Sequence, residues 1–322
     1  RFSGIFRSVE LLGQPKPHLE DLDLTPRVSD DFKDGIFNVD LKLQGNGGQV
    51  HIKAFDGQGN SIVDEVQPAA EHVAVHGVKV QNVHLWDNHH PYLYQLFIEL
   101  HDQDGQLLEV VPYQFGFRKI EINADHVVLL NGQRLIINGV NRHEWNCKTG
   151  RCVTMQDMEQ DMATFKENNI NAVRTCHYPD QLPWYSMCDQ NGIYMMAENN
   201  LETHATWQKM GQDEPSFNVP GSVPQWKDVV VDRARTNYET FKNHVSILFW
   251  SLGNESYAGD NLVFMQKFYR ERDDSRLVHY EGVVHTPDYR DKISDLESWM
   301  YLPPKDVEKY LQNNPDKPFI EC

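Results

Sequence analysis

The segment Ser246-Ile247-Leu248-Phe249-Trp250-Ser251-Leu252 is apolar along most of its length and leads directly into Gly253-Asn254-Glu255. A strand that is apolar on both faces is typical of a parallel sheet covered by helices. Upstream, Val230, Ala234, Tyr238, Phe241 and Val245 recur at helical spacing and predict one long helix that precedes this strand. The segment therefore predicts a helix–strand unit of an α/β fold.

The same alternation of extended and helical patterns repeats from residue 120 onward. Residues 135–140, 171–174 and 192–196 are predicted strands, the first of them buried, and two further β-like runs end near Glu281 and Tyr301. Thr154 is the predicted N-cap of a helix, with Asp157 at the capping-box position. Repeated units of this kind predict a parallel sheet, either doubly wound or closed into a barrel.

The first third of the chain has a different pattern. Residues 37–43 and 94–100 alternate apolar with polar side chains, as half-buried strands do, and residues 56–60 and 102–105 carry turn signals between such runs. Short strands at this spacing, without a helical pattern between them, predict an antiparallel sandwich over residues 16–119. Residues 1–15 are expected to be the tail of a preceding domain.

Composition limits the possible functions. The chain has 322 residues, which predicts two domains, and its net charge of −17 argues against nucleic acid or an anionic membrane as partner. No apolar run reaches the roughly 20 residues that a membrane-spanning helix needs. The five cysteines match no metal-site spacing and are expected to be reduced thiols of a cytoplasmic protein.

Polar residues gather directly after the predicted α/β strands, at residues 141–144, 177–179, 198–200, 254–255 and 299–301. In a βα barrel these strand ends share one face, and that face carries the active site. A doubly wound sheet also gathers strand ends, but its nucleotide sites use a glycine-rich phosphate loop. The sequence has neither G-x-G-x-x-G nor a P-loop motif, so nucleotide chemistry is not expected.

Glu255 is the strongest catalytic candidate. Burial at the end of an apolar strand can raise the pKa of a carboxylate, and such a group can protonate a glycosidic oxygen near neutral pH. Asn254 beside it can hydrogen-bond to a sugar hydroxyl. An equally weighted alternative is that Glu255 only interacts with the dipole of the next helix.

Glu202 and His204 are candidate metal ligands because two residues of a loop at this spacing can bind one cation. Carboxylate ligands suit a hard ion such as Mg²⁺ better than zinc. A Glu-x-His pair is more often ordinary surface chemistry. Together with His204, His143 and His177 fall on the predicted rim, although most histidines are structural or solvated.

At these residues the chain resembles the β-galactosidases of glycoside hydrolase family 2, particularly the large chain of the two-chain bacterial enzymes. The resemblance covers essentially the whole sequence, and its motifs are residues 1–7, 86–94, 116–118, 138–144 and 250–256. It implies the tail of a jelly-roll domain over residues 1–15 and an immunoglobulin-like sandwich over residues 16–119. It also implies a (β/α)8 TIM barrel over residues 120–322 that stops early in strand seven.

The resemblance also implies roles for individual residues. Glu255 would be the acid/base, and Glu202, His204 and Glu255 would hold Mg²⁺, with Na⁺ a possible further ion through parts outside this chain. His143, His177 and Asn254 would bind the galactosyl unit, Tyr301 would lie beside the nucleophile, and Arg174 would orient it. The activity implied is retaining hydrolysis of β-galactosides such as lactose, in a protein with a small partner subunit or self-association.

The nucleophile is expected just beyond Cys322, because the family motif places it directly after the cysteine that Cys322 matches. Glu321 falls one place too early, and a shift of one residue on a strand turns the side chain to the opposite face. The chain alone is therefore expected to be inactive, and unstable because an unclosed barrel exposes its edges. The alternatives are a β-glucuronidase, which would need cations for the sugar carboxylate, a β-mannosidase, or a non-catalytic assembly chain.

Overall fold

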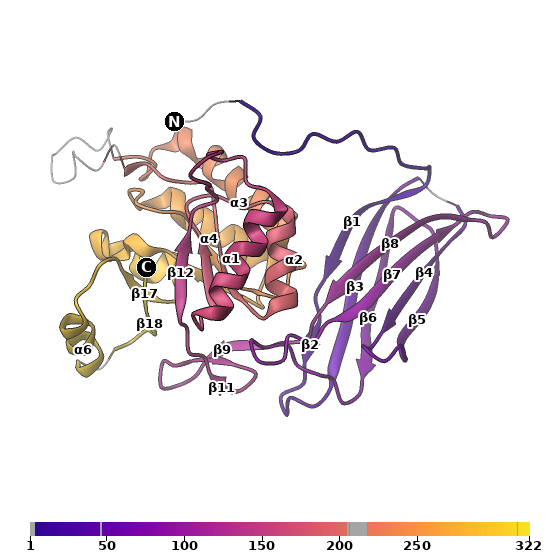
Figure 1. Cartoon of the computed structure of the whole chain (residues 1–322), viewed down its shortest axis with the longest axis horizontal. Helices are drawn as coiled ribbons and strands as arrows, with labels where there is room; N and C mark the ends of the chain where they lie inside the picture. The colour runs from indigo at the N-terminus through magenta and orange to yellow at the C-terminus, as the bar shows by residue number, and fades with distance from the viewer. Residues whose placement is uncertain (1–3, 46, 205, 207–217, 314) are drawn as a thin grey trace. The chain divides into compact units, whose positions relative to one another are not determined.

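The computed structural model describes residues 4–45, 47–204, 206, 218–313 and 315–322 (Figure 1). The internal contacts divide the chain into two compact units. The first comprises residues 1–119 with the short segments 189–192 and 242–245, and the second comprises the remainder from residue 120 onward. Among the described residues, none of the helices combines the length and the apolar character needed to cross a membrane.

The first unit is an antiparallel sandwich. Its strands are β1 (His18–Leu24), β2 (Arg27–Val28), β3 (Gly35–Gln44), β4 (Gln49–Phe55), β5 (Ser61–Pro68), β6 (His72–Val80), β7 (Tyr94–His101) and β8 (Leu107–Phe115). One sheet has the order β1-β3-β2 with β6 also paired to β3, and the other has the order β5-β4-β7-β8. Both sheets point alternate side chains inward, so that the rings of Phe37 and Phe115 lie 5.4 Å apart in the core between them.

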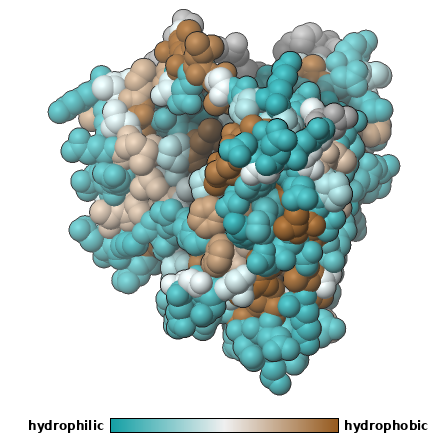
Figure 2. Space-filling model, turned by 90° about the vertical axis from the view of Figure 1, so that its right-hand side faces the viewer, coloured by the Kyte–Doolittle hydropathy of each residue, from teal (hydrophilic) through white to brown (hydrophobic). Residues whose placement is uncertain are grey.

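This arrangement confirms the predicted sandwich. Every second residue of β3 is buried, as the alternating pattern predicts. In the side view of Figure 2 the face toward the reader is mostly hydrophilic, with hydrophobic residues in separate patches. Val66 and Leu107 are among the exposed apolar side chains of this unit.

The second unit begins with a small antiparallel sheet of β9 (Ile120–Ile122), β10 (Val128–Leu130) and β11 (Gln133–Arg134). Its parallel strands are β12 (Gly139–Arg142), β13 (Ala172–Thr175), β14 (Tyr194–Glu198), β15 (Ile247–Ser251) and β16 (Leu277–His279), followed by β17 (Glu297–Trp299) and β18 (Phe319–Glu321). Its helices are α1 (Met155–Glu167), α2 (Leu182–Asn191), α3 (Lys227–Phe241), α4 (Asp260–Arg272), α5 (Arg290–Ile293) and α6 (Pro304–Gln312), with 3₁₀ turns η3 (Pro224–Trp226), η4 (Glu281–His285) and η5 (Pro287–Tyr289).

The strand order identifies a barrel. The strands β12 to β16 pair in the order of the sequence, and β17 pairs with β18 in parallel. A doubly wound sheet would reverse its order at a switch point, whereas a barrel keeps sequence order around its circumference. Figure 1 shows α1 to α4 packed around these strands, and their apolar side chains share one core with β13 to β16. The predicted partial barrel is confirmed.

Local sequence signals account for several of these elements. Thr154 caps α1 and forms the predicted capping box with Asp157. All five residues of β15 are buried, as the apolar segment predicts. The helix before it ends at Phe241, so the prediction that it continues to Val245 is wrong.

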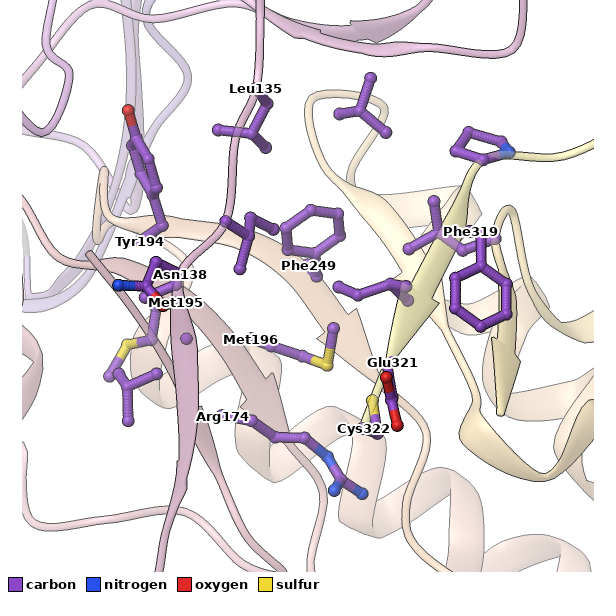
Figure 3. A pocket seen from close by; sticks show the side chains of 18 of the residues that line it. Leu135, Asn138, Arg174, Tyr194, Met195, Met196, Phe249, Phe319, Glu321 and Cys322 are labelled. Atoms are coloured by element: carbon purple, nitrogen blue, oxygen red, sulfur yellow. The ribbon is translucent and has the colours of Figure 1, made fainter. Parts of the chain in front are cut away.

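The prediction of a buried strand over residues 135–140 is also wrong. The strand β12 begins only at Gly139, and the side chains of Ile136 and Ile137 are 70% and 37% exposed. The physical reason is that residues 135–138 precede the parallel sheet, and the amide of Leu135 instead donates a hydrogen bond at 2.9 Å to the carbonyl oxygen of Val128, in the small antiparallel sheet. Figure 3 shows a cavity of about 500 Å³ that is lined by residues of β12 to β15 and of β18.

Candidate active site

The predicted site residues come together at the carboxyl ends of the barrel strands. They line a cavity of about 180 Å³, and its predicted members are His143, Arg174, His177, Glu202, Asn254, Glu255 and Tyr301. His204 contacts this group through Glu255. Cys322 lines both this cavity and the larger one of about 500 Å³, and Glu321 lines the larger one. That Glu321 is not the nucleophile stays a prediction.

The end of β15 is held against the segment that follows β14. Gly253 has a φ of +145°, and a Cβ atom on it would lie 2.6 Å from the carbonyl oxygen of Leu201. The next amide, that of Asn254, donates a hydrogen bond to the same oxygen at 2.9 Å. This close approach places Glu202 beside Asn254, whose side-chain amide donates to Oε1 of Glu202 at 3.2 Å.

We expect Gly253→Ala to destabilise the protein by about 1–3 kcal/mol, because alanine adds both backbone strain and a clash with Leu201. Gly59→Ala is the matched control, since Gly59 also has a positive φ but has open space around its Cβ position. Urea denaturation of both variants measures the difference. Equal losses for the two variants would show that the approach to Leu201 is unimportant.

Glu255 is fixed through both its backbone and its side chain. It has a φ of +36°, its amide donates to Oε1 of Glu281 at 2.5 Å, and its Oε2 lies 2.5 Å from Nδ1 of His204. The helix α4 begins only at Asp260, with Gly259 as its N-cap. The alternative in which Glu255 serves the dipole of the next helix is therefore not supported.

Glu281 is a site residue that the sequence reasoning missed. It follows β16 as the first residue of η4 and is buried. Burial raises the pKa of its carboxyl to about 7. The hydrogen bond from the Glu255 amide stabilises the charged form and lowers the pKa, but its effect is smaller than that of burial. The available signal was its position directly after an apolar run, the same signal that identified Glu255.

The pKa of Glu281 predicts a pH dependence of stability. Because the folded pKa is near 7 and the ordinary value is 4.5, the folded protein holds more protons than the unfolded chain between these values. The free energy of unfolding should therefore fall as pH rises through this window. Glu281→Gln cannot titrate, so its curve should be flatter. Urea denaturation across pH 4–8 in the presence of a chelator measures both curves, and parallel curves would contradict the assignment.

A buried ion pair joins two neighbouring barrel strands, and its arginine lines the cavity. Arg174 of β13 donates from Nε to Glu198 of β14 at 2.6 Å, from Nη1 to Asn141 at 3.1 Å and from Nη2 to Asn254 at 2.9 Å. Glu198 also accepts from Ser251 at 2.8 Å. Burial alone would raise the pKa of Glu198, but the charge of Arg174 and these hydrogen bonds hold it below its usual range. Sequence reasoning noted Glu198 at a strand end without assigning it a role.

The two histidines of the cavity are adjacent. The rings of His143 and His177 are nearly perpendicular, with centroids 5.1 Å apart. Nδ1 of His177 lies 2.8 Å from Oε1 of Glu198, so this carboxylate orients the ring. Burial, together with the neighbouring His177, lowers the pKa of His143. Cys176 lines the same cavity, and burial raises the pKa of its thiol to about 12.

The residues Glu202, His204 and Glu255 fit a divalent cation. One donor atom from each lies within 4.8 Å of the others. Two carboxylates and one imidazole form an oxygen-rich set, and such a set suits a hard ion. The carboxylates of Glu202 and Glu255 lie close to each other at one side of the cavity, and without a cation no positive ion lies between them.

The opposite wall comes from the last strands. Tyr301 follows β17, has a φ of +58° and is 85% exposed. At the end of β18, Sγ of Cys322 lies 3.4 Å from Nε2 of the buried His279, and Oγ of Ser298 lies 2.9 Å from the same nitrogen. Burial lowers the pKa of His279 to about 3, so that this buried histidine is neutral.

Comparison with protein families matches both units. The model described as glycosyl hydrolases family 2, TIM barrel domain, matches residues 120–322. The model described as glycosyl hydrolases family 2 matches residues 17–118.

Curated relatives cover the complete chain. The β-galactosidase large subunit of Lactobacillus acidophilus is 68% identical over 100% of this chain and 51% of its own length. The corresponding large subunit of Leuconostoc lactis is 55% identical over the same shares. The chain thus spans about half the length of these relatives.

Solved structures share the fold. A β-glucuronidase from Parabacteroides merdae superposes with a TM-score of 0.81 at 20% identity, over 95% of this chain and 40% of the other. A β-glucuronidase from Ruminococcus gnavus superposes with a TM-score of 0.79 at 20% identity, over 95% and 54%. At this identity the likeness shows the common architecture.

Proposed function

The chain belongs to glycosyl hydrolases family 2, and from this premise we propose that it is the central part of a retaining β-galactosidase. The observation that carries the proposal is the cavity at the barrel strand ends. There Glu255 is held at a fixed position by Glu281 and His204, among side chains that can hydrogen-bond to sugar hydroxyls. The names of the relatives, which are 55–68% identical, support galactose as the sugar.

In the proposed mechanism Glu255 donates a proton to the leaving glycosidic oxygen while a second carboxylate attacks the anomeric carbon. Glu255 then removes a proton from the water that hydrolyses the covalent galactosyl ester. In a retaining pair the two carboxyl groups lie about 5–5.5 Å apart. The proposal places the nucleophile directly after Cys322, because the family motif that Cys322 matches has its nucleophile there, and Cys322 itself lines the cavity.

Four further residues are assigned to substrate binding. The carboxylate of Glu198 engages Nδ1 of His177, which leaves Nε2 as the nitrogen for a sugar hydroxyl. His143, Asn254 and Tyr301 line the same cavity and offer an imidazole, an amide and a phenol to the galactosyl unit. Arg174 acts indirectly, since it holds Asn254 and would orient the nucleophile.

Glu202, His204 and Glu255 are proposed to hold Mg²⁺, supported by the proximity of their donor atoms. When bound, the ion supplies positive charge beside the two carboxylates. Removal of divalent ions with a chelator should lower the hydrolysis rate, and added Mg²⁺ should restore it in the parent but not in Glu202→Gln. A rate that is indifferent to the chelator would contradict the assignment.

One observation disfavours a β-glucuronidase. Of the described residues that line the cavity, Arg174 is the one with a permanent positive charge. Its guanidinium already donates hydrogen bonds to Glu198, Asn141 and Asn254. A glucuronide carboxylate needs a cation that it can approach. No observation of the described residues favours the β-mannosidase or the assembly-chain alternative.

The test of the proposed function is a panel of p-nitrophenyl glycosides with the full-length protein. We expect hydrolysis of the β-galactoside and of lactose, with far slower turnover of the β-glucuronide and the β-mannoside. A fluorinated galactoside that traps the covalent intermediate identifies the nucleophile by peptide mass spectrometry. A label on Glu321 would contradict the placement of the nucleophile, and no galactoside turnover would contradict the function.

The assembly and location are proposed together with the function. The relatives are named large subunits, which supports a small partner subunit, with self-association as the alternative. Copurification and native mass of the natural protein distinguish the two. None of the described cysteines forms a disulfide, which supports a cytoplasmic location, and fractionation of the source cells tests it.

A further inference from the structure

We propose that His143, Cys176 and His177 form a binding site for a soft transition-metal ion, such as Zn²⁺ or Cd²⁺, inside the same cavity. One donor atom from each of the three lies within 4.8 Å of the others. Donors around one tetrahedral zinc ion are about 3.3–3.8 Å apart, given metal–ligand distances of about 2.0–2.3 Å. Small rotations of side chains therefore close the site.

His177 has a carboxylate partner, as metal-bound histidines commonly do. Its Nδ1 is paired with the buried carboxylate of Glu198 at 2.8 Å. A carboxylate in this position keeps the proton on Nδ1 and makes Nε2 a better electron-pair donor, as the outer carboxylates of zinc sites do. Glu198 is itself fixed by Arg174 and Ser251, so the orientation of the ring is set before any ion arrives.

The chemistry of the donors separates this site from the one formed by Glu202, His204 and Glu255. A thiolate with two imidazoles selects soft and borderline ions, whereas carboxylates select hard ones. Binding replaces the thiol proton of Cys176, which is released to solvent, one proton for each ion bound. The occupied site would exclude a sugar, a consequence that rests on the proposed role of His143 and His177.

The experiment titrates the full-length protein, saturated with Mg²⁺, with Co²⁺ as a spectroscopic probe for the soft site. We expect a thiolate-to-cobalt absorption band that saturates at one ion per chain. The band should disappear in Cys176→Ser and persist in Cys152→Ser, because Cys152 is exposed and lies outside the cluster. His143→Asn, a change at an exposed residue, should weaken cobalt binding by at least about tenfold, since even loss of an outer partner costs 10–100-fold.

A kinetic arm follows from the same site. Zn²⁺ should inhibit β-galactoside hydrolysis in competition with substrate. The rate of each variant with Zn²⁺ is compared with its own rate without Zn²⁺. Absence of the band in the parent, or a band that survives in Cys176→Ser, overturns the metal site. A normal band in a protein that cleaves no galactoside overturns the proposed function and leaves the metal site standing.

Discussion

Glu255→Gln should lower kcat/KM for lactose by about 10²–10⁴-fold, the range that general acid–base catalysis contributes. The glutamine keeps the shape of the side chain and retains the backbone amide that binds Glu281, but it has no proton to give to the leaving oxygen. The change is therefore expected to affect chemistry far more than folding. The matched control is Glu159→Gln, at an exposed position of α1, which should retain the parent rate.

The dependence on the leaving group identifies the role of Glu255. Dinitrophenol departs without protonation, so the loss in the first step should be much smaller for the dinitrophenyl galactoside than for lactose. Added azide should then accelerate turnover and yield galactosyl azide, because azide needs no general base. An equal loss for both substrates without azide rescue would mean that Glu255 is not the acid/base. A similar pattern in Glu202→Gln would point to the cation instead.

Arg174→Met should reduce the free energy of unfolding by about 3–5 kcal/mol, the cost of leaving one partner of a buried ion pair without the other. Arg174 is 5% exposed, and the side chain of Glu198 is completely buried. Without the arginine, the carboxylate must remain charged in a dry environment or take up a proton. The loss should therefore shrink at acidic pH, where Glu198 becomes neutral at lower cost.

Two comparisons make this result specific. The double variant Arg174→Met/Glu198→Gln should be more stable than Arg174→Met alone, because the buried charge is gone. Arg235→Met removes an exposed ion pair with Asp232 and should cost less than about 1 kcal/mol. Chemical denaturation at pH 7 measures all three. A double variant that is no better than the single one would assign the loss to packing and not to charge.

The sequence carried enough information to predict most of the fold because its signals are local. Alternation along β3 and the unbroken apolar run of β15 each depend on which faces of one strand are buried, and the structure buries those faces. The capping box at Thr154 is complete within four residues. The end of α3 was predicted wrongly because Val245 fits the helical spacing and is buried, although the helix ends at Phe241.

What the sequence could not supply are the contacts between distant segments. Ile136 has the apolar side chain of a core residue, but it is exposed because the strand begins only at Gly139 and the amide of Leu135 pairs with Val128 of another sheet. Glu281 reaches the Glu255 amide across 26 positions, and Glu198 meets Arg174 across 24. No spacing rule connects such pairs, so sequence reasoning could mark strand ends as important without stating which side chain holds which.

The pairing pattern of the barrel strands makes part of the cavity wall a rigid unit. The strands β13 to β15 have hydrogen-bonded neighbours on both sides. Amide protons of β14 and β15 should therefore exchange with deuterium only through large openings of the structure. Arg174 belongs to β13 and Glu255 follows β15, so both are carried by this slowly exchanging sheet. A ligand that contacts these two residues would find their positions already set, and its binding should add little exchange protection to β14 and β15.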